Sequence, residues 1–253
     1  METIIICIIA GLGAGLGTGF AGMSAAVVIS PMLITFLGLN PYEAIGIALA
    51  SDVLASAISA VTYAKNKNID IVNSKWLIIS VLTFTLIGSR VAHLVPTTTM
   101  GNLTVYASLL MGLKFLFTKE TEKPKKAREF KGKMLIIVPV LCGAFIGFIC
   151  GFIGAGGGIM MLMILTMILG YELKTAVGTS VFIMTFTALF GASSHFYLQG
   201  AFPDPIIFIT CVISTLVFAL LGARFANKAT PKVLNRSTGI VLTTLGIFMI
   251  MFS

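Results

Sequence analysis

Apolar stretches, each long enough to form a membrane-spanning helix of about 20 residues, recur along the whole 253-residue chain. This recurrence is the strongest constraint on the fold. Only 10% of the residues are charged and 57% are hydrophobic, and the mean hydropathy is +1.05. A soluble chain of this length needs a polar shell, and a membrane β-barrel would show alternating segments of about ten residues instead. We therefore predict an all-α integral membrane protein.

The sequence also contains an internal repeat, which is clearest in the positions of its glycines. At an offset of 132 residues, six glycines of the first half fall on glycines of the second half, where chance would give about two. The six matched pairs are Gly11 and Gly143, Gly15 and Gly147, Gly19 and Gly151, Gly22 and Gly154, Gly38 and Gly170, and Gly46 and Gly178. We therefore predict a first membrane repeat at residues 1–117, a basic linker at 118–133 and a second membrane repeat at 134–253.

Each repeat opens with a glycine-rich apolar stretch, at residues 3–37 and 134–169, that is too long for one simple span. Three spans of ordinary length follow each stretch, at 45–64, 76–94 and 102–117, and at 176–198, 206–223 and 238–252. If the opening stretch crosses twice, or dips in and returns, 16 of the 17 Lys and Arg residues share one face and only Arg90 lies opposite. A single crossing would split the basic loops between the two faces. The positive-inside rule therefore predicts inverted repeats in a bacterial cytoplasmic (inner) membrane, with cytoplasmic basic loops and both termini outside.

Two kinds of glycine occur in the opening stretches. Those spaced four residues apart, such as Gly11, Gly15 and Gly19, predict a helix face that another backbone can approach closely. Those in the middle of each stretch predict a broken helix, because each glycine weakens a helix by ~1 kcal/mol relative to Ala. Unwound backbone at membrane depth is tolerated where it is buried or lines a wet cavity, and the resuming helix offers N–H groups to an anion.

We therefore expect an anion site at the two breaks, with a plain tight turn as the alternative. The candidate substrate-binding residues there are Gly22, Met23, Ser24, Gly154, Ala155, Gly156, Gly157 and Gly158. Hydroxyl groups that follow each opening stretch are further candidates, although membrane hydroxyls often bond their own helix instead. These are Ser51, Thr179 and Ser180.

Asp52 and His195 are the candidates for coupling transport to protons or cations. A carboxylate inside an apolar helix costs ~2.5 kcal/mol or more unless it is paired or hydrated, so Asp52 predicts either a coupling site or a structural pair. His195 lies near the end of its predicted helix, where it either relays protons or rests at the interface. The other histidine, His93, lies in an unrelated position without an HExxH pattern, so we expect no metal, no cofactor and no enzyme. The four cysteines show no CxxC spacing and are interpreted as packing residues.

Three segments of the chain resemble the sulfite exporter TauE/SafE family of bacterial anion transporters. They are GLGAGLGTGFAGMSAAVVISPMLITFLGLNPYEAIG (11–46), GAFIGFICGFIGAGGGIMMLMILTMILGYELKTAVGTS (143–180) and SHFYLQGAF (194–202). The resemblance covers essentially the whole chain and implies export of sulfite or of C2 sulfonates such as sulfoacetate. The first half has Ile47-Ala48 where the second has Thr179-Ser180, so the implied site is asymmetric.

The sequence thus predicts a secondary transporter that moves a small anion by alternating access, one half rocking against the other, with Asp52 as the coupling group. The predicted substrate is a sulfur oxyanion or organosulfonate of the sulfite, thiosulfate or sulfoacetate type. A passive anion channel is the alternative, and an intramembrane enzyme is less favoured. Membrane lipid is an expected partner, whereas nucleic acid is not, because the basic residues lie in loops between spans. A homodimer is left open.

Overall fold

The computed structural model describes residues 2–100, 132–154, 157–200 and 202–226, together with residues 102, 103, 106, 109, 110, 113 and 243. Across these residues the chain is helical and contains no strand, which confirms the all-α fold class. Most of the predicted spans at 102–117 and 238–252, and almost all of the predicted linker, lie outside the described residues. Ala155 and Gly156 of the candidate site lie outside them as well.

The described helices follow the order of the predicted opening stretches and of the predicted spans at 45–64, 76–94, 176–198 and 206–223. They are α1 (Glu2–Ala21), α2 (Ala26–Leu37), α3 (Pro41–Lys65), α4 (Ile71–Ala92), α6 (Met134–Ile153), α7 (Gly157–Met163), the π-helical turn η1 (Ile164–Ile168), α8 (Leu173–Gln199) and α9 (Pro205–Ala226). Six of these helices, namely α1, α3, α4, α6, α8 and α9, are long and apolar enough to cross a membrane. At 12 residues, α2 is only about 18 Å long, so it reaches about half-way through a bilayer.

Both opening stretches are broken at the predicted glycines. The first break separates α1 from α2, and the second separates α6 from α7. Gly22 and Gly154 adopt positive φ angles of 61° and 74° at the two breaks, a conformation that glycine reaches without steric cost. Gly38 and Gly170 likewise have φ angles of 63° and 72°. These two pairs of glycines, each related by the offset of 132, therefore share their backbone conformation.

The two repeats exchange helices, because each opening helix packs on a helix of the other repeat. The helix α1 packs on α9, and α6 packs on α4. The six glycines with four-residue spacing lie in these contacts: Gly11 faces Ser214, Gly15 faces Thr215 and Ala219, Gly19 faces Ala219 and Ala223, Gly143 faces Leu77 and Ser80, Gly147 faces Val81, and Gly151 faces Thr85 and Ser89. The contacts advance together along both chains, so the helices of each pair run parallel. The predicted close approach of backbones at these glycines is therefore present in both pairs.

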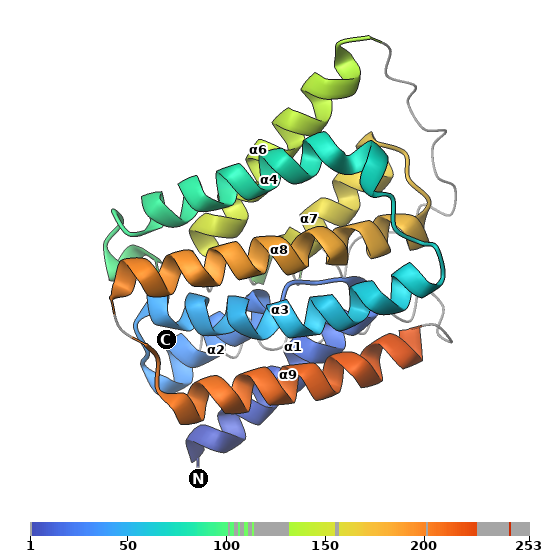
Figure 1. Ribbon diagram of the computed structural model, residues 1–253. Coiled ribbons are helices and arrows are strands. Elements are labelled where there is room, and N and C mark those ends of the chain that lie inside the picture. The colour runs from blue at the N-terminus through green and yellow to red at the C-terminus, as the bar shows by residue number, and fades with distance from the viewer. Residues whose placement is uncertain are drawn as a thin grey trace.

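The helices α3 and α8 pack together between these two pairs (Figure 1). Gly46 of α3 faces Phe196 of α8, and Gly178 of α8 faces Tyr63 of α3, so the two helices run in opposite directions. The helix α8 therefore ends where α3 begins, and α9 starts at that same end because it follows α8 directly. Since α1 runs parallel to α9, α1 also starts at the end where α3 begins. The stretch α1–α2 therefore returns to the end at which it began (Figure 1).

We expect Gly15→Ala to lower the thermal stability of the detergent-solubilised protein. A Cβ atom at this position would meet the backbone of Thr215 and Ala219 in α9, which cannot move aside cheaply, and such overpacking costs about 1–3 kcal/mol. Gly17→Ala is the matched control on the same helix, because its Cβ would meet only the flexible end of the Met23 side chain. Thermal unfolding should show a lower midpoint for Gly15→Ala than for Gly17→Ala. Equal midpoints would contradict the backbone contact between α1 and α9.

Candidate functional site

The two broken segments meet inside the bundle. Gly158, in the first turn of α7, lies directly against the backbone carbonyl of Gly22, and a Cβ atom added to it would also come within 2.9 Å of the Met23 Cα. On its other side, Gly22 faces Ser180 of α8, whose Oγ lies 3.2 Å from the Cβ position built at the glycine. Gly154 faces Ile45 of α3. The structure therefore brings the predicted residues of both breaks into one buried place.

Asp52 lies beside this meeting point, near the middle of the 25-residue α3. Its side chain is fully buried, and it is the only Asp, Glu, Lys or Arg among the buried residues that the structure describes. The Ser24 hydroxyl donates to Asp52 Oδ2 at 2.8 Å and also lies 3.4 Å from the carbonyl oxygen of Gly154. Asp52 Oδ1 has no hydrogen-bond partner among the described residues. The carboxylate is therefore only partly satisfied and is linked to both breaks through Ser24.

The carboxylate also lies at the N-terminal end of α2. The Ala25 backbone N–H faces Asp52, and the Ala26 N–H donates to Ser24 Oγ at 3.3 Å. The first amides of a helix carry a partial positive charge and favour an anion. Asp52 thus occupies the place that the sequence assigned to a bound anion. An anion bound there would be repelled by ionised Asp52 and would tolerate the protonated form.

Two further side chains belong to this centre, although the sequence did not indicate them. The Cys150 thiol in α6 contacts the Thr187 hydroxyl of α8 and the backbone N–H of Gly157, and it lies close enough to Asp52 to sense its charge. The sequence interpretation treated Cys150 as a packing residue because it has no CxxC partner. Only the packing of α6, α7 and α8 around Asp52 shows that the thiol lies in a polar centre.

The three predicted hydroxyl groups differ in where the structure places them. Ser51 Oγ donates to the Ile47 carbonyl of its own helix at 2.9 Å, as the alternative interpretation expected. Thr179 Oγ1 accepts a hydrogen bond of 3.0 Å from the Asp70 backbone N–H, just before the start of α4. Ser180 donates to the Val177 carbonyl at 2.9 Å but lies beside Gly22. Of the three, Ser180 is therefore the hydroxyl that we place at the breaks.

His195 is fully buried, and its Nε2 lies 3.0 Å from the carbonyl oxygen of Gly151 in α6. This carbonyl is one turn before the second break. The interpretation of His93 and His195 as unrelated residues is wrong, because their ring centroids lie 5.5 Å apart. The two positions are distant in sequence, but α4 and α8 pack together and end at the same side of the bundle.

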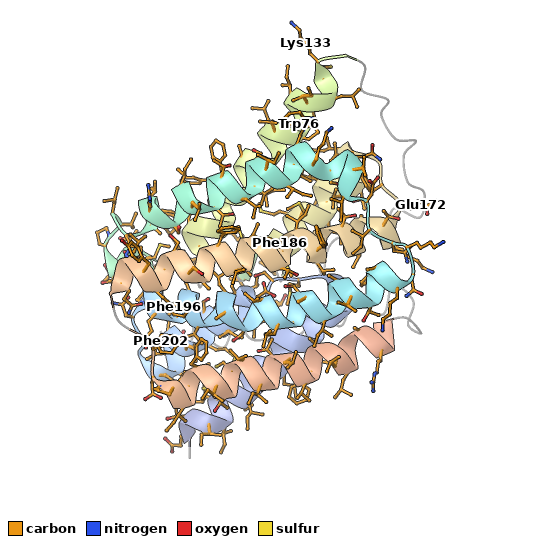
Figure 2. The ribbon with its side chains drawn as sticks, in the orientation of Figure 1. Trp76, Lys133, Glu172, Phe186, Phe196 and Phe202 are labelled. Carbon is orange, nitrogen blue, oxygen red and sulfur yellow. The ribbon has the colours of Figure 1, made fainter. Side chains whose placement is uncertain are left out.

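Basic residues gather at the opposite end of the helix bundle. The helix ends that carry Lys65, Lys75, Lys174 and Arg224 lie together on the right of Figure 1. Glu172 lies on that side in Figure 2 and Lys133 lies at the top, whereas Phe196 and Phe202 lie at the other end. Arg90, in the last turn of α4, is at the end where α4 stops. The charge is therefore polarised along the helix axes.

These features define an integral membrane protein with several spans, in which two broken helices enclose a buried acid. Such an arrangement is typical of membrane transporters. The sequence profile of the family described as "Sulfite exporter TauE/SafE" matches residues 7–249, and the chain belongs to this family. It is 26% identical to a probable membrane transporter protein of Methanocaldococcus jannaschii, over 97% of this chain and 95% of that protein. It is also 22% identical to the probable membrane transporter protein YunE of Bacillus subtilis, over 96% of each chain.

We expect Asp52→Asn to leave the thermal stability unchanged or to raise it. The change removes a buried charge that is only partly hydrogen-bonded, and the Ser24 hydroxyl can still donate to the amide oxygen. Ser24→Ala should instead lower the stability by about 1–3 kcal/mol, because it leaves Asp52 Oδ2 without its donor.

Ser51→Ala serves as the control in the same thermal unfolding series, since its hydroxyl bonds only its own helix. Its midpoint should stay close to that of the unaltered protein. A greater loss of stability in Asp52→Asn than in Ser24→Ala would show that the carboxylate is a structural anchor and not a half-satisfied functional group.

Proposed function

We propose that this protein is a secondary carrier for a small anion, namely a sulfur oxyanion or organosulfonate of the sulfite, thiosulfate or sulfoacetate type. The observation that carries the proposal is the buried meeting of two broken helices around Asp52. Non-helical backbone at membrane depth is tolerated where protein buries it or where it lines a cavity, and a scaffold has no need of it. The family description, which names sulfite export, supports the class of substrate.

Protonation of Asp52 couples anion binding to the proton gradient in this proposal. When Asp52 is ionised, its carboxylate accepts a hydrogen bond from the Ser24 hydroxyl and faces the Ala25 amide. These two donors are then occupied, and a second negative charge is repelled. When a proton binds, the charge disappears and the donors become available to a substrate oxyanion. The proton and the anion therefore cross the membrane in the same direction. Low pH on the loading side favours binding.

The packing of helices across the two halves supports a particular choice of moving bodies for alternating access. The glycine contacts hold α1 firmly to α9 and α6 firmly to α4, so neither sequence half can rock as a unit without separating backbones in contact. We assign the relative motion to the α1–α9 pair and the α4–α6 pair, on either side of α3 and α8. This replaces the idea of one half rocking against the other. The Gly158–Gly22 contact between the two breaks opens and closes during this motion.

The same arrangement supports inverted repeats in a bacterial cytoplasmic membrane. The helices α3 and α8 are related by the duplication and run in opposite directions, and the opening stretch α1–α2 returns to the end at which it began. The end that gathers the described basic residues would face the cytoplasm by the positive-inside rule. The N-terminus of α1 would then face the outside.

Transport by the purified protein in proteoliposomes tests the function. Sulfite, thiosulfate, sulfoacetate and a carboxylate such as acetate are offered with and without an imposed proton gradient. We expect at least one sulfur anion to move with the gradient, and Asp52→Asn to abolish this dependence while anion exchange across the membrane without a gradient persists. Ser51→Ala is the control and should retain gradient-driven transport.

Two results would overturn the proposal. Movement of no small anion would remove the transport function as stated. Flux that ignores the proton gradient, together with full activity in Asp52→Asn, would indicate a passive channel.

A further inference from the structure

A second buried polar cluster lies at the end of the bundle where α4 and α8 stop. His93 directly follows the last residue of α4, and His195 lies in the penultimate turn of α8. Their ring centroids are 5.5 Å apart with planes tilted by 40°. Tyr42, at the start of α3, stacks on His93 with a centroid distance of 4.5 Å. Three helices from both repeats therefore join at this pair of imidazoles.

Each imidazole has one buried nitrogen without a hydrogen-bond partner. His195 Nε2 contacts the Gly151 carbonyl, which can only accept, so Nε2 carries the hydrogen and Nδ1 of the neutral ring holds a free lone pair. Among the residues that the structure describes, neither His195 Nδ1 nor His93 Nε2 has a hydrogen-bond partner, and both atoms are buried. A buried polar atom left without a partner costs about 1–3 kcal/mol. Two such atoms on two rings in contact therefore point to a functional use.

None of the described groups around the two histidines exchanges protons near neutral pH, so the imidazoles themselves are the candidates for this role. The Tyr42 hydroxyl donates to the Val95 carbonyl, and a phenol ionises only near pH 10. The Ser89 and Ser194 hydroxyls bond each other at 2.7 Å, and Arg90 is exposed. Among the described residues, no Asp or Glu side chain is hydrogen-bonded to either ring. Burial lowers the pKa of His93, which directly follows the last residue of α4.

The pair lies between this end of the bundle and the Asp52 centre. His195 is bonded to α6 at Gly151, one turn before Gly154, whose carbonyl lies near Ser24. Along α8, eight residues separate His195 from Thr187 of the Asp52 centre, which corresponds to about 12 Å. On α8 over this distance, Ala188 and Ala192 are buried in the core, whereas Leu189 and Phe190 are exposed.

We propose that His93 and His195 form a proton-loading station that exchanges protons between the aqueous phase at this end and Asp52. The inference rests on the proposed proton-coupled transport. A proton from the aqueous phase binds His93, and a proton then passes from His93 Nε2 through a bridging water molecule to the lone pair of His195 Nδ1, so that His93 returns to its neutral form. The protonated His195 then gives up one proton through water to the Asp52 carboxylate, so that charge is conserved at each step. Neither histidine contacts the anion.

A pH jump on the reconstituted protein tests this station without any transported anion. Time-resolved infrared spectroscopy follows the carbonyl stretch of protonated Asp52, which is assigned by its absence in Asp52→Asn. We expect protonation to be slowed roughly tenfold or more in His93→Gln and in His195→Gln, and to be partly restored by added imidazole. Gln at 195 keeps an N–H donor for the Gly151 carbonyl, and His93→Gln, at the helix end, tests the same prediction should the other variant fold poorly.

Ser194→Ala is the matched control, because it removes the hydroxyl beside His195 but no imidazole, and its protonation rate should equal that of the unaltered protein. An unchanged rate in His93→Gln, or a slowed rate that imidazole does not restore, would overturn the station. Sulfite flux measured on the same preparations separates the two proposals. If the histidines behave as expected but no anion moves in the unaltered protein, the transport proposal fails and the station stands.

Discussion

The contact between the two broken helices is the constraint on which the rest of the structure depends. A break leaves backbone N–H and C=O groups without partners inside their own helix, and hydrocarbon offers none. Here each break is covered by the other, with Gly158 against the Gly22 carbonyl and Ser24 near the Gly154 carbonyl. This burial requires the opening helices to enter from opposite sides of α3 and α8. The glycine faces of α1 and α6 make that close packing achievable.

The meeting point is asymmetric, although the glycines at the two breaks match in position and conformation. The first repeat supplies Asp52 and Ser24, whereas the second supplies Cys150, Thr187 and a run of glycines. A carboxylate on one side alone lets a single proton change the charge of the whole centre. Two facing acids would repel each other or share one proton. The two sequence halves therefore contribute different side chains to this centre, and Asp52 is the only carboxylate among its described residues.

Much of this architecture was predictable because it depends on local chemistry. Hydropathy located α3, α4, α8 and α9 to within five residues, and the glycines in the middle of each opening stretch located both breaks. Asp52 and Ser24 were found because an acid in an apolar helix and a hydroxyl at a break are unusual in their local surroundings. Pairing between helices was not predictable, because a glycine face shows that some helix approaches but not which one. For that reason the sequence did not indicate the position of Cys150 or the contact of His93 with His195. Ser51 and Thr179 were candidates for the site, but in the structure their hydroxyls make hydrogen bonds elsewhere, to the Ile47 carbonyl and from the Asp70 N–H.

The exchange of helices between repeats has a consequence for biosynthesis. The chain emerges from its N-terminus, so α1 enters the bilayer long before its partner α9 has been made. Until then its glycine face lies against lipid, and the first break lacks the backbone that later covers it. Neither half can complete its own packing, so the two repeats form one folding unit whose assembly waits for the second half of the chain. A chain that stops before α9 would leave α1 inserted but unmatched, which exposes it to membrane quality control however well its own sequence favours a helix.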